Sequence, residues 1–100
     1  MKRDKALSLV GLATKAGKVV SGEFMTEKSI RAGHARLVIV AMDASDNTKK
    51  KFQNACDYYR VPIYFYSDKM TLGNAIGKEY RASLGVIDDG LANEIIKYLG

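Results

Sequence analysis

Two patterns of apolar residues alternate along this chain. In one pattern, apolar residues recur every three or four positions, as in a helix that faces a core. In the other, as at 36–41, they form a short continuous run, which is typical of a strand buried on both faces. Asp4 and Ser21 suit the N-caps of the first two helices. The patterns predict helices at 4–16, 22–32, 46–59, from 67 or 68 to 77 and from 88 or 89 onward, and strands at 18–21, 36–41, 61–66 and 84–87.

This alternation predicts an α/β fold in a single domain that spans residues 1–100. Strands that alternate with helices form one central sheet with helices on both faces, which makes a three-layer α/β/α sandwich. The segment Leu37–Ala41 has no polar residue on either face, so we expect it at the centre of the sheet. Two domains would leave about 50 residues each, near the lower limit for an independent core.

Composition excludes several classes of protein. Hydrophobic residues make up 47% of the chain and charged residues 27%, which excludes a disordered chain. No apolar run approaches the length needed to cross a bilayer, so we expect no membrane partner. Cys56 is the only cysteine, which excludes an internal disulfide and suits the reducing cytoplasm. Lys2 and Arg3 before an apolar stretch imitate a secretory signal, but Asp4 and the missing cleavage site argue against one.

The positive charge of the chain is concentrated in its first half. The net charge is +5, and residues 2–36 hold eight basic and three acidic residues. Such a basic region indicates a polyanionic partner, which is usually nucleic acid, or it serves only to keep a small protein soluble. The three lysines at 49–51 point in different directions around a helix, so we interpret them as a solvated face.

Residues that could support catalysis are few. His34 is the only histidine, and its place at a helix end predicts that it complements the helix dipole or is simply exposed. Cys56 lies on the apolar stripe of a helix, where a buried and unreactive thiol is expected. Asp88 and Asp89 are interpreted as helix caps rather than paired carboxylates. We therefore expect no catalytic residue, no metal site and no cofactor.

The second predicted helix is the main candidate for binding. From Gly22 onward, its first backbone N–H groups have no helical partner and are available to phosphate or base oxygens. Lys28 and Arg31 follow one to two turns later, and Lys15 and Lys18 flank the strand before it. We expect these cations to surround one binding surface.

The loop 78–83 is a second candidate for binding. Tyr80 and Arg81 offer an aromatic ring and a cation, while Ala82 and Ser83 are small enough for a base to approach the backbone. The alternative interpretation is that Tyr80 takes part in ordinary loop packing.

Several residues and motifs occur in a recognisable order along nearly the whole chain. They are Gly22, Lys28, the passage 33–43, Val61-Pro-Ile and the run Leu72-Gly-Asn-Ala-Ile-Gly. This order resembles the kink-turn-binding ribosomal protein family, and the chain looks most like the small bacterial members. The resemblance implies an α/β/α sandwich around a four-stranded mixed sheet, without catalysis.

Members of that family bind the sharp bend of a kink-turn RNA. The N-terminus of the second helix reads sheared G·A pairs, and the loop before the last strand covers a flipped-out nucleotide. For this chain, the resemblance implies RNA contacts at Gly22, Lys28, Asp43 and the loop from Tyr80 to Ser83. The implied partner is structured RNA, with ribosomal RNA as one candidate, and we expect the protein to act as a monomer.

The chain departs from the family in the residues that follow Gly22. Glu23 stands where members have a small residue, and Phe24 and Met25 replace Asn and Glu, which bond the G·A pairs. Phe24 either stacks on a base or packs inward. Because phosphate contacts position while base contacts specify, RNA affinity can persist with altered specificity. The alternative function is a protein-interaction module that docks on ribosomal or translation proteins.

Overall fold

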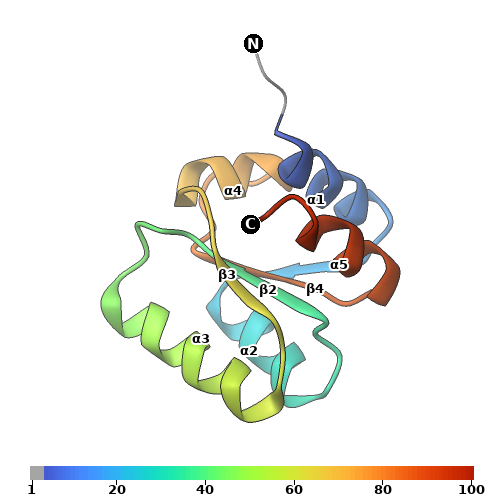
Figure 1. Ribbon diagram of the computed structural model, residues 1–100. Coiled ribbons are helices and arrows are strands. Elements are labelled where there is room, and N and C mark those ends of the chain that lie inside the picture. The colour runs from blue at the N-terminus through green and yellow to red at the C-terminus, as the bar shows by residue number, and fades with distance from the viewer. Residues whose placement is uncertain (1–3) are drawn as a thin grey trace.

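The computed structural model describes residues 4–100 and follows the predicted order of helices and strands (Figure 1). Lys2 and Arg3, which imitate a signal sequence, lie outside the described residues. The elements are α1 (Lys5–Lys15), β1 (Val19–Ser21), α2 (Glu23–Arg31), β2 (Leu37–Val40), α3 (Asp46–Tyr59), β3 (Ile63–Phe65), α4 (Lys69–Ala75), β4 (Ser83–Val86) and α5 (Asp89–Ile96).

Side-chain caps begin four of the five helices. Asp4, Ser45, Asp68 and Asp88 each accept a hydrogen bond from the backbone N–H three residues later, as their residue types predict. The prediction that Ser21 caps α2 is wrong. The strand continues through Ser21, so the N-cap of α2 is Gly22. Gly22 has no side chain that could accept a capping bond.

The four strands form one mixed sheet in the order β1-β4-β2-β3. Strand β2 pairs with β3 in parallel, and β4 lies antiparallel to both β1 and β2. All four residues of β2 are buried, and the strand has a neighbour on each side. The predicted internal position of Leu37–Ala41 is therefore confirmed.

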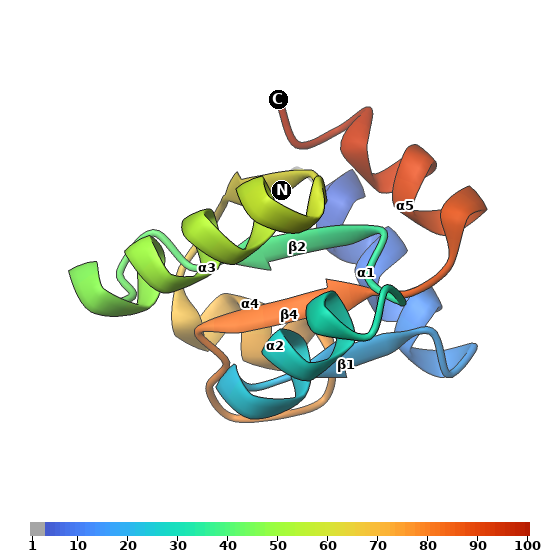
Figure 2. The ribbon, with the colours of Figure 1, turned by 90° about the horizontal axis from the view of Figure 1, so that it is seen from below.

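Helices cover both faces of this sheet. Figure 1 shows α1, α4 and α5 on one face, and Figure 2 shows α2 and α3 against the other. The first face packs Leu37, Ile39 and Leu84 against apolar residues of the three helices. The second face packs Val38 and Val40 against residues of α2 and α3, including Ile30, Phe52 and Cys56. The predicted three-layer sandwich is confirmed.

The antiparallel insertion of β4 determines where the loops meet. Ser21 pairs with Leu84, and Val40 pairs with both Ser83 and Phe65. The ends of β1, β2 and β3 therefore lie at the same edge of the sheet as the beginning of β4. This edge, called the binding edge below, carries the start of α2, the loop after β2, the start of α4 and the loop before β4. Within residues 4–100, no helix is long and apolar enough to span a membrane.

Gly73 permits the loop before β4 to cross closely over α4. A Cβ atom at this position would lie 2.6 Å from the Glu79 carbonyl oxygen and 2.8 Å from the Tyr80 nitrogen. The Gly73 carbonyl also accepts a bond from the Lys78 N–H at 2.8 Å. We predict that Gly73→Ala lowers the free energy of unfolding by about 1–3 kcal/mol in urea denaturation, because backbone must move to admit the methyl group.

Gly90→Ala is the matched control for this substitution. Gly90 also lies in a helix, but a Cβ there would meet nothing closer than Asp88 Oδ2 at 3.5 Å, an ordinary contact. Alanine at position 90 is expected to be neutral or to stabilise by up to about 1 kcal/mol. Equal effects of the two substitutions would contradict the close crossing at Gly73.

Candidate nucleic-acid interface

The first turn of α2 is fixed at the binding edge by one backbone bond. The Gly22 N–H donates to the Ser83 carbonyl oxygen at 3.0 Å, which joins the start of α2 to the start of β4. Gly22 has φ 88° and ψ 160°, a conformation that residues with a Cβ rarely adopt. The N–H of Gly22 is consequently occupied, and the expectation that it is available to RNA is wrong. The N–H groups of Glu23, Phe24 and Met25 have no acceptor within residues 4–100.

Two large apolar side chains lie exposed in this turn. Phe24 is 73% exposed and Met25 is 45% exposed. Of the two alternatives for Phe24, inward packing is therefore excluded. Exposure of a phenyl ring at this place contributes little to the core and leaves a ring face available to a partner.

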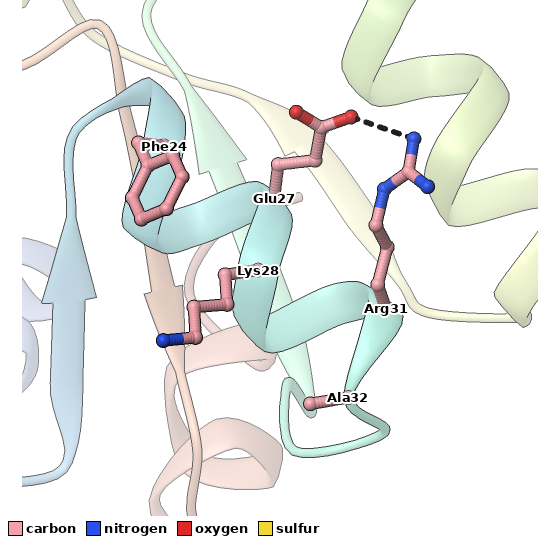
Figure 3. A pocket seen from close by; sticks show the side chains of 5 residues that line it. All are labelled: Phe24, Glu27, Lys28, Arg31 and Ala32. Carbon is pink, nitrogen blue, oxygen red and sulfur yellow. Dashed lines mark hydrogen bonds and ion pairs between the residues drawn. The ribbon is translucent and has the colours of Figure 1, made fainter.

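Lys28 lies one turn beyond Phe24 on the same side of α2 (Figure 3). Its side chain is exposed, and it forms no ion pair among residues 4–100. A hollow of about 530 Å³ is lined by Phe24, Lys28 and Arg31 together with Glu27 and Ala32. An aromatic ring and an uncompensated ammonium group thus occupy the same surface.

Arg31 differs from Lys28 because its charge is compensated. Its guanidinium lies 3.1 Å from Glu27 Oε2, one turn earlier on the same helix (Figure 3). From α3, Lys51 Nζ lies 2.9 Å from Glu23 Oε2 and 3.0 Å from Glu27 Oε1. The Lys51 ammonium, with Arg31, lowers the pKa of Glu27, and the two carboxylates raise the pKa of Lys51. The interpretation of Lys51 as merely solvated is wrong, since it connects α3 to α2.

The loop before β4 lies beside the start of α2. Tyr80 is 59% exposed, so it is available to a partner. Arg81 is half-buried, and its Nε donates to Ser21 Oγ at 3.1 Å while its NH1 donates to the Tyr80 carbonyl. Arg81 therefore connects the loop to the end of β1. Ala82 is half-buried, and Ser83 is a buried residue of β4 rather than a loop residue.

Asp43 connects the loop after β2 to α4. Its Oδ1 accepts a bond from the Lys69 N–H at 2.9 Å, in the first turn of that helix. Asp68, which precedes Lys69 in the chain, accepts bonds from the Thr71 N–H and hydroxyl, and these bonds lower the pKa of Asp68. Both carboxylates thus satisfy donors that a helix start leaves unpaired.

Lys15 and Lys18 are not brought to the binding edge. Lys15 ends α1, and the Lys18 carbonyl accepts a bond from the Ile87 N–H beyond the far end of β4. Both lysines precede β1, whereas α2 follows it, so the length of the strand separates them from Gly22. We expected the basic residues to surround one surface, but the extended strand β1 places Lys15 and Lys18 at its opposite end from α2.

The residues considered for catalysis have the following surroundings in the structure. His34 is exposed, and burial raises the pKa of the Cys56 thiol to about 12. Asp88 caps α5, and Asp89 forms an ion pair with Arg36 at 3.1 Å. Among residues 4–100, no group of three or more His, Cys, Asp or Glu is placed to hold a metal ion.

Comparison with known proteins shows to which protein family the chain belongs. Residues 4–96 match the model of the ribosomal protein L7Ae/L30e/S12e/Gadd45 family. The chain belongs to this family. The relationship expected from the motif order at 22–77 is therefore confirmed.

Relatives within the family include small bacterial proteins. The chain is 47% identical to the RNA-binding protein YlxQ of Bacillus subtilis over 91 residues, which are 91% of each chain. It is 32% identical to the large ribosomal subunit protein eL8 of Thermoplasma volcanium over 94 residues, covering 93% of this chain and 78% of eL8. The Giardia lamblia 15.5kD RNA binding protein superposes with a TM-score of 0.81 at 25% identity, covering 100% and 89% of the two chains.

Met70 and Asn74 belong to the same edge but were missed from the sequence. With Glu79 and Tyr80 they line a hollow of about 300 Å³ between α4 and the loop. The sequence offered one indication, because the apolar residue Met70 does not lie on the helix face that carries Leu72 and Ile76. Only the folded loop, however, shows that Met70 lies beside Tyr80.

We predict that Asp43→Ala lowers the free energy of unfolding by about 0.5–2 kcal/mol, because the Lys69 N–H loses its acceptor. Asp43→Asn keeps an oxygen in reach and is expected to cost less. Urea denaturation of the two variants measures the difference. If neither variant changes stability, the bond does not hold the loop to α4.

Proposed function

We propose that this protein is a non-catalytic RNA-binding protein that recognises structured RNA, a kink-turn or a related bend, in association with the ribosome or translation. The observation that carries the proposal is the binding edge itself. It places unpaired backbone N–H groups, the exposed Phe24 and Met25, Lys28 and Tyr80 on elements that are held together by backbone bonds.

Each of these groups suits a different part of a bent RNA. Backbone N–H groups at a helix start and the Lys28 ammonium suit phosphate oxygens. Exposed rings at Phe24 and Tyr80 suit bases that a bend has unstacked, and such bases are where proteins usually obtain RNA specificity. Arg81 is assigned a positioning role, since its guanidinium is bonded within the protein.

The relatives support the same class of partner. Two of them are named as RNA-binding proteins and a third as a ribosomal subunit protein. We extend this to ribosomal RNA as a candidate ligand, to a monomeric binding unit and to a cytoplasmic site of action.

A protein-interaction module is the second candidate function, and the exposure of Phe24 and Met25 favours it. The adjacent Lys28 favours RNA instead, because an apolar patch with an uncompensated cation suits a polyanion. Pull-downs with and without nuclease, with the retained RNA sequenced, separate the two functions. Partners that survive nuclease, with no RNA retained in the untreated sample, would support docking on protein.

We predict that Lys28→Ala weakens binding nearly uniformly across RNA sequences and lowers the slope of log affinity against log salt by about one unit. A phosphate contact releases about one counterion and reads no base. Fluorescence titrations of a kink-turn RNA at several salt concentrations measure both quantities.

Lys97→Ala is the matched control. Lys97 is an exposed lysine at the end of α5, on the opposite face of the sheet, where it pairs with Glu94. Its removal is expected to leave the salt slope unchanged. A Lys28→Ala variant that folds and binds like the unmodified protein removes Lys28 from the interface.

We predict that the protein discriminates only weakly between a standard kink-turn and one whose G·A pairs are replaced by Watson–Crick pairs. Phe24 and Met25 offer no side-chain hydrogen bond to base edges, whereas a bidentate contact gives about 1–3 kcal/mol of discrimination in the DNA case. The double substitution Phe24→Asn, Met25→Glu is expected to gain preference for the intact kink-turn in a competition assay at fixed salt.

A preference of a hundredfold or more in the unmodified protein would contradict this reading of the site. Stacking by Phe24 adds affinity without base identity, so the Phe24→Asn change alone is expected to weaken binding to both RNAs.

A further inference from the structure

The outer surface of α2 and α3 continues from the binding edge. The two helices lie side by side on one face of the sheet, and both begin at that edge (Figure 2). The hollow beside Phe24 and Lys28 shares Glu27 and Arg31 with a second hollow of about 470 Å³ that lies between the helices. The two hollows therefore form one surface, called the α2–α3 surface below.

Tyr58 is the most exposed large hydrophobic residue on this surface, at 79%. It lines the second hollow, and its ring meets Tyr59 edge-on, with centroids 4.8 Å apart and planes at 73°. Tyr59 thus contacts the Tyr58 ring, while Tyr58 remains largely exposed. A phenol so exposed contributes little to the fold, but it suits stacking against a flat partner.

Two cations of the α2–α3 surface, Lys51 and Arg31, are held in place by carboxylates and still have unused N–H donors. Lys51 uses two of its three N–H donors on Glu23 and Glu27, and the pair of Arg31 with Glu27 uses one of five. The remaining donors are available to a phosphate. Asn54, which also lines the second hollow, offers an amide that can bond a base edge.

We infer that the α2–α3 surface binds an unpaired RNA strand that continues from the bend, with one base stacked on Tyr58. This inference rests on the proposed function. An unpaired strand fits because stacking on a side chain requires an open base face, which a duplex does not offer. We choose RNA over protein as the occupant because the surface adjoins the binding edge and includes Lys28, whose charge is uncompensated among residues 4–100.

The length of the surface sets the length of strand. Lys51 and Tyr58 lie seven residues apart on α3, about 10 Å along the helix axis. At a rise of ~3.4 Å per nucleotide along the axis of a stacked strand, this distance holds about three nucleotides.

The test compares a blunt kink-turn RNA with the same RNA carrying three unpaired nucleotides at one strand end, each end in turn. One of the extended RNAs is expected to bind the unmodified protein more tightly than the blunt RNA. Tyr58→Ala is expected to remove roughly 5- to 150-fold of this gain, while leaving affinity for the blunt RNA unchanged. Tyr58→Phe, which keeps the ring, is expected to retain the gain.

Tyr98→Ala is the matched control, because Tyr98 is an exposed tyrosine beyond α5 on the opposite side of the sheet. It is expected to leave the gain intact. The inference is overturned if neither extension strengthens binding, if folded Tyr58→Ala keeps the full gain, or if Tyr58 is needed instead to retain a protein partner after nuclease treatment. Failure of the blunt RNA to bind would refute the proposed function, and the inference with it.

Discussion

The position of β4 between β1 and β2 is the constraint on which the rest of the structure depends. The antiparallel pairing puts the first residue of β4 beside the last residues of β1 and β2, although 60 residues of sequence separate Ser21 from Arg81, which are bonded there. The Gly22 N–H then attaches the start of α2 to Ser83. Without this insertion, the start of α2 and the Tyr80 loop would lie on different parts of the molecule.

Close packing of α2 on β4 follows from the same arrangement. A Cβ at Gly85 would lie 3.3 Å from a Val20 methyl group and 3.4 Å from Ser29 Oγ, so the missing side chain lets the helix approach the strand. The approach has a cost, because the hydroxyls of Thr26 and Ser83 are buried without a partner among the described residues. A buried donor left unpaired costs about 1–3 kcal/mol. Close packing and the Gly22 bond therefore hold α2 against β4, while these two hydroxyls remain buried and unpaired among the described residues.

Local residue patterns were enough to predict the helices and strands, and the order of the motifs was enough to predict the family. Apolar runs located β2, and helix spacing located the core faces. Capping residue types identified Asp4 as the start of α1 and limited the starts of α4 and α5 to two positions each, of which the structure selects Asp68 and Asp88. Contacts between distant segments could not be read in this way. The bond of Lys51 to Glu23 and the loss of Lys15 and Lys18 from the binding edge both depend on how whole elements are placed.

The residues that would read RNA are those that contribute least to the fold. Phe24, Met25 and Tyr80 are largely or substantially exposed, whereas Gly22, Gly73 and Ser83 set the backbone that carries them. Substitutions of surface residues away from caps and buried networks usually change stability little. The identities at 24 and 25 are therefore free to vary while the backbone frame stays constant. On this argument, a chain can keep the family fold and its phosphate-facing groups while the side chains that meet the bases, and with them the preferred RNA, are replaced.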